Sequence, residues 1–399
     1  MPVPNHFTII PMHTPNHESE PADVLIIGAS AAGLAVAACL KHESISNITI
    51  LEMADKVGAA WRRHYDRLHL HTDKGNSNLP YLPFSRDTPR YPSRQQVINY
   101  LETYAEQFDL HPHFGQKATN IELLNGLWHV TTTKSHFIGR NLVMATGYTN
   151  QPVVPSWPGQ DQFDGRILHS SQYKNGAEFA GKNVLVVGFG NSGGEIAIDL
   201  HEHGAHPGIS VRSPVNVIPR DILGIPILSI GILMSKLPTA VADALAAPLL
   251  KLTIGDLTRY GLRKLPYGPN TQIVRDGRIP LLDIGTVSLI KQGELQVKPA
   301  IKQFDPEGVQ FVNGQSQAYE AVVLATGYRP NLEIFADGIG PALDDTGQPL
   351  CSGQESSLAG LYFCGFYVSP TGMLREIGIE ARQIAQSIKA KRNPQISAD

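Results

Sequence analysis

The sequence has 399 residues, of which 42% are hydrophobic and 17% are charged, and its formal net charge is −3. This length and composition are typical of a globular protein with two or three domains, and the charge gives no reason to expect nucleic acid or an anionic membrane as partner. The cysteines Cys39, Cys351 and Cys364 form neither a CxxC pair nor a metal-ligand cluster. We therefore predict no disulfide framework and no metal site, and scattered thiols fit the cytoplasm.

Residues 1–21 are polar and rich in proline and histidine, without the cationic start and apolar stretch of a secretion signal. We expect a poorly ordered tail in which His6, His13 and His17 are solvated rather than bound to metal. The first predicted strand, Ala22–Ile27, follows this tail.

A glycine turn after this strand leads into a predicted helix over Leu34–Leu40. A strand, a tight turn and a helix start together present free backbone N–H groups to the phosphates of a dinucleotide. Gly28 allows the sharp turn and Gly33 lets the helix pack on the strand, whereas Ser30 replaces the middle glycine and is tolerated if its φ is negative. The residues predicted to bind this nucleotide are Gly28, Ala29, Ser30, Ala32 and Gly33.

The second strand, Asn47–Leu51, is followed by Glu52, 24 residues after Gly28. A carboxylate at this place suits a ribose with a free 2′-hydroxyl, as in FAD or NAD. The alternative is a strand–turn–helix unit that binds no nucleotide, and Glu52 argues against it.

Three further elements complete the first part of the chain. The pattern predicts an amphipathic helix over Pro92–Phe108 with Ser93 as its cap, and a hairpin over Ile121–Thr132. A buried strand, Asn141–Ala145, then leads into Thr146-Gly147-Tyr148.

A proline-rich crossing, Gln151–Pro158, is the predicted hinge into a second domain. The second glycine turn lies about 160 residues after the first, where the β-branched run Val184–Val187 is followed by Gly188, Gly190 and Gly193. This spacing is the full dinucleotide pattern, in which the middle glycine lets the pyrophosphate approach the backbone.

The next strand, Ile209–Arg212, carries Arg212 and Ser213 where the first domain has its acid. An arginine there suits the 2′-phosphate of NADP, although it is also consistent with a plain surface residue. For Asp221–Leu252 we expect helices that are buried or line a substrate pocket, with a membrane-surface patch as the alternative. Its charge-free stretch Ile222–Ser235 is too short to span a bilayer.

The pattern over residues 289–324 predicts short strands, the last of which is Ala321–Leu324. The following Thr326 and Gly327 belong to a second Ala-Thr-Gly-Tyr turn. A last strand over Gly360–Gly365 and a closing helix over Met373–Lys389 complete the chain.

These elements predict an α/β fold with two dinucleotide-binding, Rossmann-like domains, the NADPH domain being inserted into the FAD domain. The expected segments are a tail over 1–21, the first part of the FAD domain over 22–155, the NADPH domain over 156–328, and the remainder of the FAD domain over 329–399.

One further motif, Phe163-x-Gly165-x-x-x-His169-x-x-x-Tyr173, precedes the second turn. It resembles the motif that identifies flavin-containing monooxygenases. Five further stretches resemble the plant YUCCA branch, which oxidises indole-3-pyruvate to indole-3-acetate: residues 58–61, 65–68, 82–84, 91–92 and 190–193. The serine at position 30 and the segment Lys74–Leu79 depart from the pattern of many plant members.

The resemblance implies FAD and NADPH as cofactors, with a small organic substrate and O₂ as the other reactants. It implies hydride transfer to the flavin and a C4a-(hydro)peroxyflavin that oxygenates an amine or sulfide, or decarboxylates a 2-oxo acid. Candidates for binding a substrate carboxylate are Arg62, Arg63, Arg275 and Arg278, and a surface salt bridge is the favoured alternative for any one of them.

Asn191 and His169 are predicted to position NADP⁺ and the reacting groups, and His169 is not interpreted as a general base. Trp61 either stacks near the flavin or fills the core. The full set of expected cofactor contacts adds Trp61, His69, Thr72, Thr146, Gly147, Gly188, Gly190, Asn191, Ser192, Gly193, Arg212, Ser213, Thr326, Gly327, Gly365 and Leu374 to the first turn and Glu52.

Other activities remain open from the residues alone. A Baeyer–Villiger monooxygenase shares both turns, but its motif usually ends in tryptophan where this chain has Tyr173. A disulfide reductase needs a redox cysteine pair, which is absent. A flavoprotein that senses redox state or releases peroxide without oxygenating a substrate is the alternative from another class.

Overall fold

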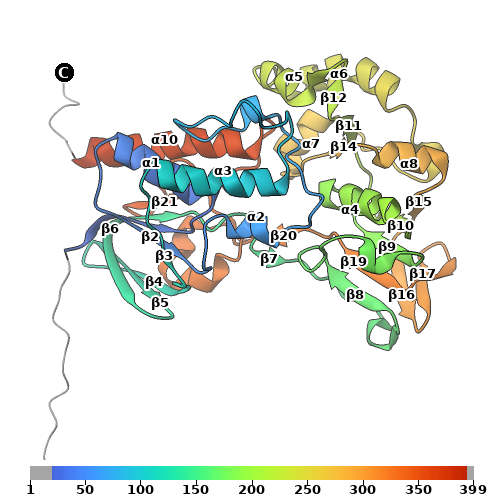
Figure 1. The fold of residues 1–399 in the computed structure, drawn as a ribbon, viewed down its shortest axis with the longest axis horizontal. Coiled ribbons are helices and arrows are strands. Elements are labelled where there is room, and N and C mark those ends of the chain that lie inside the picture. The colour runs from blue at the N-terminus through green and yellow to red at the C-terminus, as the bar shows by residue number, and fades with distance from the viewer. Residues whose placement is uncertain (1–19, 393–399) are drawn as a thin grey trace, which may run out of the picture.

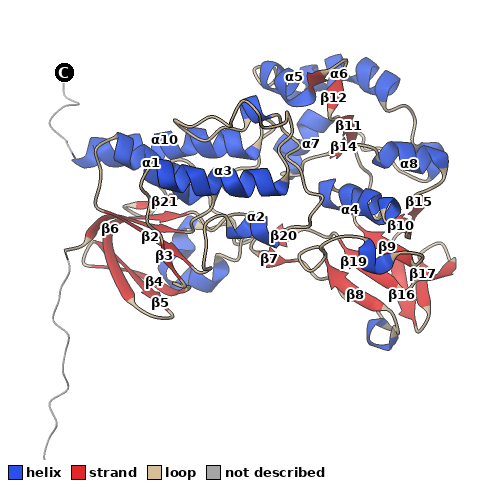
Figure 2. Cartoon of the chain, viewed as in Figure 1, coloured by secondary structure: helices blue, strands red, loops and turns tan. Residues whose placement is uncertain are grey.

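The computed structural model describes residues 20–392. The predicted tail over 1–21 therefore lies almost entirely outside the described residues. Two α/β units lie side by side, each built on its own sheet (Figure 1). Helices cover these sheets in both units (Figure 2). The prediction of two Rossmann-like sheets is thus confirmed.

The first sheet has seven strands in the order β3-β2-β1-β6-β5-β4, and β21 also pairs with β6. Its strands β1, β2, β3, β6 and β21 are parallel, whereas β4 and β5 join β6 as an antiparallel meander that contains the predicted hairpin. The strands are β1 (Ala22–Ile27), β2 (Ile48–Glu52), β3 (His113–Phe114), β4 (Ala118–Leu124), β5 (Leu127–Thr132), β6 (His136–Met144) and β21 (Leu361–Phe363).

The second sheet has five parallel strands in the order β15-β10-β9-β19-β8. In both sheets the strand before the glycine turn, β1 or β9, lies between the next strand of its unit and a strand that is followed directly by Ala-Thr-Gly-Tyr. This is where the strand order reverses, and ligands bind at such points. The strands are β8 (Arg166–His169), β9 (Asn183–Val187), β10 (His206–Ser210), β15 (Gln296–Lys298) and β19 (Ala321–Leu324).

The second sheet is built wholly from residues between β6 and β21, so it is an insertion into the unit of the first sheet. The chain crosses between the units at β7 (Gln151–Pro152) and again at β20 (Tyr328–Arg329). These two crossings pair with each other in antiparallel register, Pro152 facing Tyr328. The exact domain limits at 155/156 and 328/329 stay predictions.

Helix α1 (Ala31–His42) is buried along residues 31–40, because it lies between β1 on one side and the helices α3 (Arg94–Gln107) and α10 (Met373–Arg392) on the other. It is apolar all round, as a helix covered on every side must be. The predicted cap of α3 is confirmed: Ser93 accepts from the Gln96 N–H and the Gln96 side chain accepts from the Ser93 N–H.

The region between β10 and β15 differs in part from the prediction. Residues 221–226 form two short strands before the helices begin, and a helix over Thr286–Gln292 includes residues 289–292, where strands were expected. The Asp283 carboxylate accepts the N–H groups of Gly285 and Val287 and so starts that helix. The elements are β11 (Val217–Pro219), β12 (Asp221–Ile222), β13 (Ile225–Pro226), α5 (Ile227–Met234), α6 (Thr239–Thr253), α7 (Pro269–Asp276), β14 (Leu281–Asp283) and α8 (Thr286–Gln292).

The remaining helices and strands include α4, which follows the second glycine turn, and a small sheet formed by β16, β17 and β18. They are α2 (Ala59–Arg63), α4 (Asn191–Glu202), β16 (Ile301–Asp305), β17 (Gly308–Phe311), β18 (Ser316–Ala318) and α9 (Ala336–Ile339). Over the described range 20–392, no helix is both long enough and apolar enough to cross a membrane.

Candidate active site

The first glycine turn connects β1 to α1 and needs glycine for reasons internal to the protein. Gly28 has φ +113°, and a Cβ there would lie 2.5 Å from the carbonyl oxygen of Ala145. A Cβ on Gly33 would collide with the carbonyl of Gly28, so the helix packs against the turn only without a side chain. Ser30 occupies the N-cap position of α1 with φ −108°, the negative φ on which tolerance of a serine at the middle position depends.

The second turn repeats this geometry between β9 and α4. Gly188 has φ +114°, a Cβ on it would collide with the carbonyl of Ala325, and a Cβ on Gly193 would collide with the carbonyl of Gly188. A Cβ on Gly190 would meet no atom within 4 Å. The backbone at Gly190 is therefore open on the side where a pyrophosphate is expected to approach.

The repeated Ala-Thr-Gly-Tyr sequence now has a structural reason, because each alanine carbonyl closes against the first glycine of one turn. The two threonines differ in their contacts. Thr326 donates its hydroxyl to the carbonyl of Val153 at 2.5 Å, whereas the buried Oγ1 of Thr146 has no partner within the described chain. A buried hydroxyl without a partner is costly, so Thr146 is a candidate ligand contact.

The residues at the two strand ends have opposite surroundings. Glu52, the last residue of β2, is buried, and its two oxygens accept the N–H groups of Ala29 at 2.7 Å and Ala54 at 2.9 Å. Arg212 and Ser213 are exposed and lie beyond β10, which ends at Ser210 rather than at the predicted Arg212. Within residues 20–392 no carboxylate forms an ion pair with Arg212.

The motif that precedes the second turn forms hydrogen bonds to the second Ala-Thr-Gly-Tyr turn and to α4. His169, at the end of β8, accepts the Ser171 N–H at Nδ1 and donates from Nε2 to the carbonyl of Gly327 at 3.1 Å. Burial lowers the pKa of His169, which favours this neutral form. Tyr173 donates its hydroxyl to Asp199 of α4 at 2.5 Å. His169 therefore orients the second Ala-Thr-Gly-Tyr turn.

One cavity of about 880 Å³ joins the two turns. Its wall includes the start of α1, the start of α4, the segment 60–72 and residues 365–377. The predicted site residues that line it are Ser30, Ala32, Trp61, His69, Thr72, Thr146, Gly147, Asn191, Ser192, Gly365 and Leu374. The others lie outside its wall: Gly28, Ala29, Gly33, Glu52, Gly188, Gly190, Gly193, Arg212, Ser213, His169, Thr326 and Gly327.

The far side of this cavity is apolar. It is lined by side chains of α5 and α6, among them Leu228, Ile230 and Leu249, so these helices line a pocket as expected, and substrate binding in this pocket stays a prediction. These helices are not buried as a whole, because Leu233 and Leu252 are 72% and 83% exposed.

Comparisons with known proteins place these features in a family. A family model described as pyridine nucleotide-disulphide oxidoreductase matches residues 25–217. The probable indole-3-pyruvate monooxygenase YUCCA9 of Arabidopsis thaliana is 38% identical over 393 residues, which cover 92% of each chain. The indole-3-pyruvate monooxygenase YUCCA6 of the same plant is 37% identical and covers 91% of this chain and 89% of its own.

The chain belongs to the YUCCA family of flavin monooxygenases. It is accordingly an enzyme of the NADPH- and FAD-dependent class. The cysteines Cys39, Cys351 and Cys364 are all free, and Cys39 and Cys364 are buried.

Solved structures agree with a YUCCA-family enzyme at the level of the fold. A flavin-containing monooxygenase from Stenotrophomonas maltophilia has a TM-score of 0.72 at 21% identity and covers 94% of this chain and all of its own. The open structure of cyclohexanone monooxygenase also has a TM-score of 0.72, at 18% identity, over 94% of this chain and 89% of that one.

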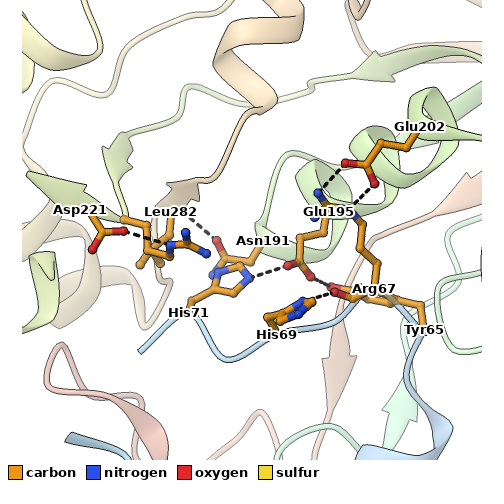
Figure 3. Close-up of polar contacts among 10 residues, drawn as sticks. Tyr65, Arg67, His69, His71, Asn191, Glu195, Glu202, Asp221 and Leu282 are labelled. Carbon is orange, nitrogen blue, oxygen red and sulfur yellow. Dashed lines mark hydrogen bonds and ion pairs between the residues drawn. The ribbon is translucent and has the colours of Figure 1, made fainter. Parts of the chain in front are cut away.

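Sequence reasoning missed one group of side chains in this YUCCA-family site. Glu195 of α4 is buried, and it accepts the hydroxyl of Tyr65 at 2.6 Å while its other oxygen lies 3.2 Å from Nε2 of His71 (Figure 3). Glu195 follows Asn191 by four residues, so both share one face of the helix. That spacing was the available signal, but the contact between Tyr65 and Glu195 bridges 130 positions of the sequence.

His64, which also lines the cavity, is expected to make the free energy of unfolding depend on pH. Burial, reinforced by Arg63, Lys174 and Arg94, lowers its pKa from 6.5 to about 4. Because the unfolded chain binds the proton more readily, this contribution to stability is present above pH 6.5 and is lost as the pH falls towards 4. We expect His64 to account for about 2 kcal/mol of the stability lost between pH 7 and pH 5.

Urea unfolding of the wild type and of His64→Gln at both pH values measures this. The variant should lose about 2 kcal/mol less on acidification than the wild type. Equal losses would show that His64 is not held neutral.

Proposed function

We propose that this enzyme oxygenates a 2-oxo acid such as indole-3-pyruvate, with FAD bound at the first turn and NADPH at the second. The balanced reaction converts the 2-oxo acid, O₂, NADPH and a proton into the shortened carboxylic acid, CO₂, water and NADP⁺. The observation that carries the proposal is the single cavity that touches both turns and extends between α5 and α6.

The residues present fit the two cofactors. Around the first turn, the backbone at Gly147 is open, the buried hydroxyl of Thr146 has no partner among residues 20–392, and Glu52 retains lone pairs for a ribose hydroxyl. Bound FAD and NADPH supply the redox chemistry that activates O₂. The protein holds both and keeps water from the reacting groups.

At the second turn the helix start of α4 and the open backbone at Gly190 suit the pyrophosphate. Asn191 fixes its side chain by accepting the Leu282 N–H at 2.8 Å, and this leaves its amide donors for NADP⁺ or substrate. Arg212 supplies the positive charge for a 2′-phosphate.

The charges around the cavity favour an anionic substrate over an amine. Its described lining includes Arg63 but no aspartate or glutamate. Of the four candidate arginines, Arg63 lines the cavity, whereas Arg62, Arg275 and Arg278 do not. Arg62 pairs with Glu102 at 2.5 Å, and Arg275 stacks on Tyr267. An ammonium substrate finds no buried carboxylate on this wall, whereas a carboxylate finds a cation.

The test is NADPH-dependent product formation with indole-3-pyruvate, phenylpyruvate, trimethylamine and a simple sulfide, measured side by side with peroxide release. We expect the two 2-oxo acids to yield the shortened acid in step with NADPH consumption, and little peroxide. Preferential oxidation of the amine or sulfide overturns the substrate class. Peroxide release that no substrate suppresses overturns oxygenation itself and favours an NADPH oxidase.

A further inference from the structure

A short segment of the first unit, residues 65–68, is anchored in the second unit. Tyr65 is buried in the hydrophobic core of the second unit, together with Val184 of β9 and Ile196 of α4. Five residues later, Leu70 belongs to the core of the first unit. The segment therefore crosses the boundary between the two units within a few residues, and it is one of the stretches that resemble the YUCCA branch.

Two polar side chains of this segment bind one face of α4. The hydroxyl of Tyr65 donates to Oε2 of Glu195 at 2.6 Å, and burial raises the pKa of Tyr65, so the hydroxyl stays a donor. The guanidinium of Arg67 donates to both carboxylate oxygens of Glu202, at 2.8 and 2.9 Å (Figure 3). Because Glu195 and Glu202 are seven residues apart, they lie on the same face of the helix.

The residue between these two side chains is held from both units. The N–H of Asp66 donates to the carbonyl oxygen of Lys174 at 2.8 Å, and the ammonium of Lys174 donates to the carbonyl of Arg63 at 2.9 Å. The carboxylate of Asp66 accepts from Arg94, the first residue of α3, at 2.9 Å. Residues 65–67 therefore lie between α3 of the first unit and α4 of the second, and a shift of one unit against the other must break these contacts.

The helix to which the segment is bound begins at the second glycine turn. Asn191 and Ser192, at the start of α4, line the cavity, and so do Tyr65 and, on the first unit, Ser30 and Ala32 at the start of α1. Transfer between two bound groups is sensitive to their alignment, and a misplacement of about 1 Å can cost about 100-fold in rate. The contacts of residues 65–67 are thus placed to set the alignment of whatever the two turns bind.

We propose that residues 65–67 position α4, and with it the nicotinamide of NADPH, relative to the flavin. Tyr65 and Arg67 act through α4 and are positioning residues. The Tyr65–Glu195 contact is the more important of the two, because it is buried, whereas Glu202 is half exposed and water screens its pairing with Arg67. This inference rests on the proposed function, since it takes FAD at the first turn and NADPH at the second.

The experiment compares Tyr65→Phe with the wild type as FAD-loaded enzyme, without O₂ and without substrate. Stopped-flow absorbance gives the limiting rate of flavin reduction at saturating NADPH, and calorimetry gives the Kd of NADP⁺. We expect the limiting rate to fall about tenfold or more with little change in Kd, because alignment is lost while the contacts of the nucleotide remain. Hydrogen exchange is a readout that needs no reaction: peptides containing Asp66 should exchange faster in the variant, since the segment is released from the second unit.

Tyr173→Phe is the matched control. Tyr173 is also buried, and its hydroxyl donates to Asp199 of the same helix at 2.5 Å, but both residues belong to the second unit. This variant removes an equivalent hydrogen bond from α4 and leaves the contact between the units intact, so it should lower thermal stability without slowing flavin reduction. Reduction by dithionite, which needs no nicotinamide, should proceed at the same rate in all three proteins.

An unchanged limiting rate in Tyr65→Phe, or an equal fall in Tyr173→Phe, overturns the proposal. A fall in rate with an equal loss of NADP⁺ affinity also overturns it, because Tyr65 would then bind the nucleotide itself. Should Tyr65→Phe not fold, a charge exchange tests the same boundary: Arg67→Glu should slow reduction, and adding Glu202→Arg should restore it. A wild type that NADPH does not reduce refutes the proposed function, whereas a normal wild type with an equally fast Tyr65→Phe refutes only the positioning role.

Discussion

Gly28→Val is expected to purify as a protein without flavin. The residue has φ +113°, a region that a β-branched side chain does not adopt without strain, and the new Cβ would lie 2.5 Å from the carbonyl oxygen of Ala145. The turn must then open and lose the alignment of its N–H groups towards the phosphates. The flavin absorbance of purified protein, compared with the protein absorbance, should fall to a few per cent of the wild-type ratio.

Two valine variants serve as controls for this result. Gly126→Val introduces the same side chain at φ +79° in the β4–β5 hairpin, where a Cβ meets nothing within 4 Å, so it reports backbone strain alone and should retain flavin. Gly188→Val repeats the clash in the second turn and should remain yellow but no longer be reduced by NADPH. A yellow Gly28→Val protein would contradict the assignment of FAD to the first turn. A colourless Gly188→Val protein would contradict the assignment of NADPH to the second turn.

Arg212→Ala should raise the apparent Michaelis constant for NADPH by about tenfold or more and leave that for NADH almost unchanged. The guanidinium is exposed beyond the end of β10, beside the second glycine turn, where the 2′-phosphate of NADPH would lie. A charge-assisted contact of this kind contributes about 1.5–3 kcal/mol, and NADH has no 2′-phosphate to lose it. Steady-state kinetics with both cofactors provide the measurement.

Arg166→Ala is a suitable comparison for Arg212→Ala. Arg166 lies on β8 of the same sheet and pairs with Glu178 at 2.7 Å, so its removal changes the surface charge equally without touching the second turn. If both cofactors weaken alike in Arg212→Ala, or if Arg166→Ala has the same effect on NADPH, then Arg212 does not bind the 2′-phosphate.

The elements that the sequence predicted well are those with local causes. Both glycine turns and the strands before them follow from short-range requirements, since Gly28 and Gly188 need positive φ and have no room for a Cβ. The cap at Ser93 likewise involves residues only three positions apart. The helix α8 was missed because its β-branched residues favour strand, and the side chain that starts it, Asp283, lies outside the expected segment.

The parts of the site that were not predicted depend on contacts across the chain. The carbonyls of Ala145 and Ala325 each lie against a glycine turn that is more than 100 residues earlier in the chain, a contact that local sequence patterns do not report. The group of Tyr65, His71 and Glu195 forms because two distant segments meet at the seam of the two units. Periodicity reports which face of a helix is buried, but not which side chain of another segment lies against it.

The pairing of β7 with β20 means that the second unit begins and finishes at neighbouring points, with Pro152 opposite Tyr328. Removing everything between them would leave two chain ends already close enough for a short loop to connect. The second unit is therefore inserted as a module that could be gained, lost or replaced at the paired strands β7 and β20. The strands of the first sheet would keep their order.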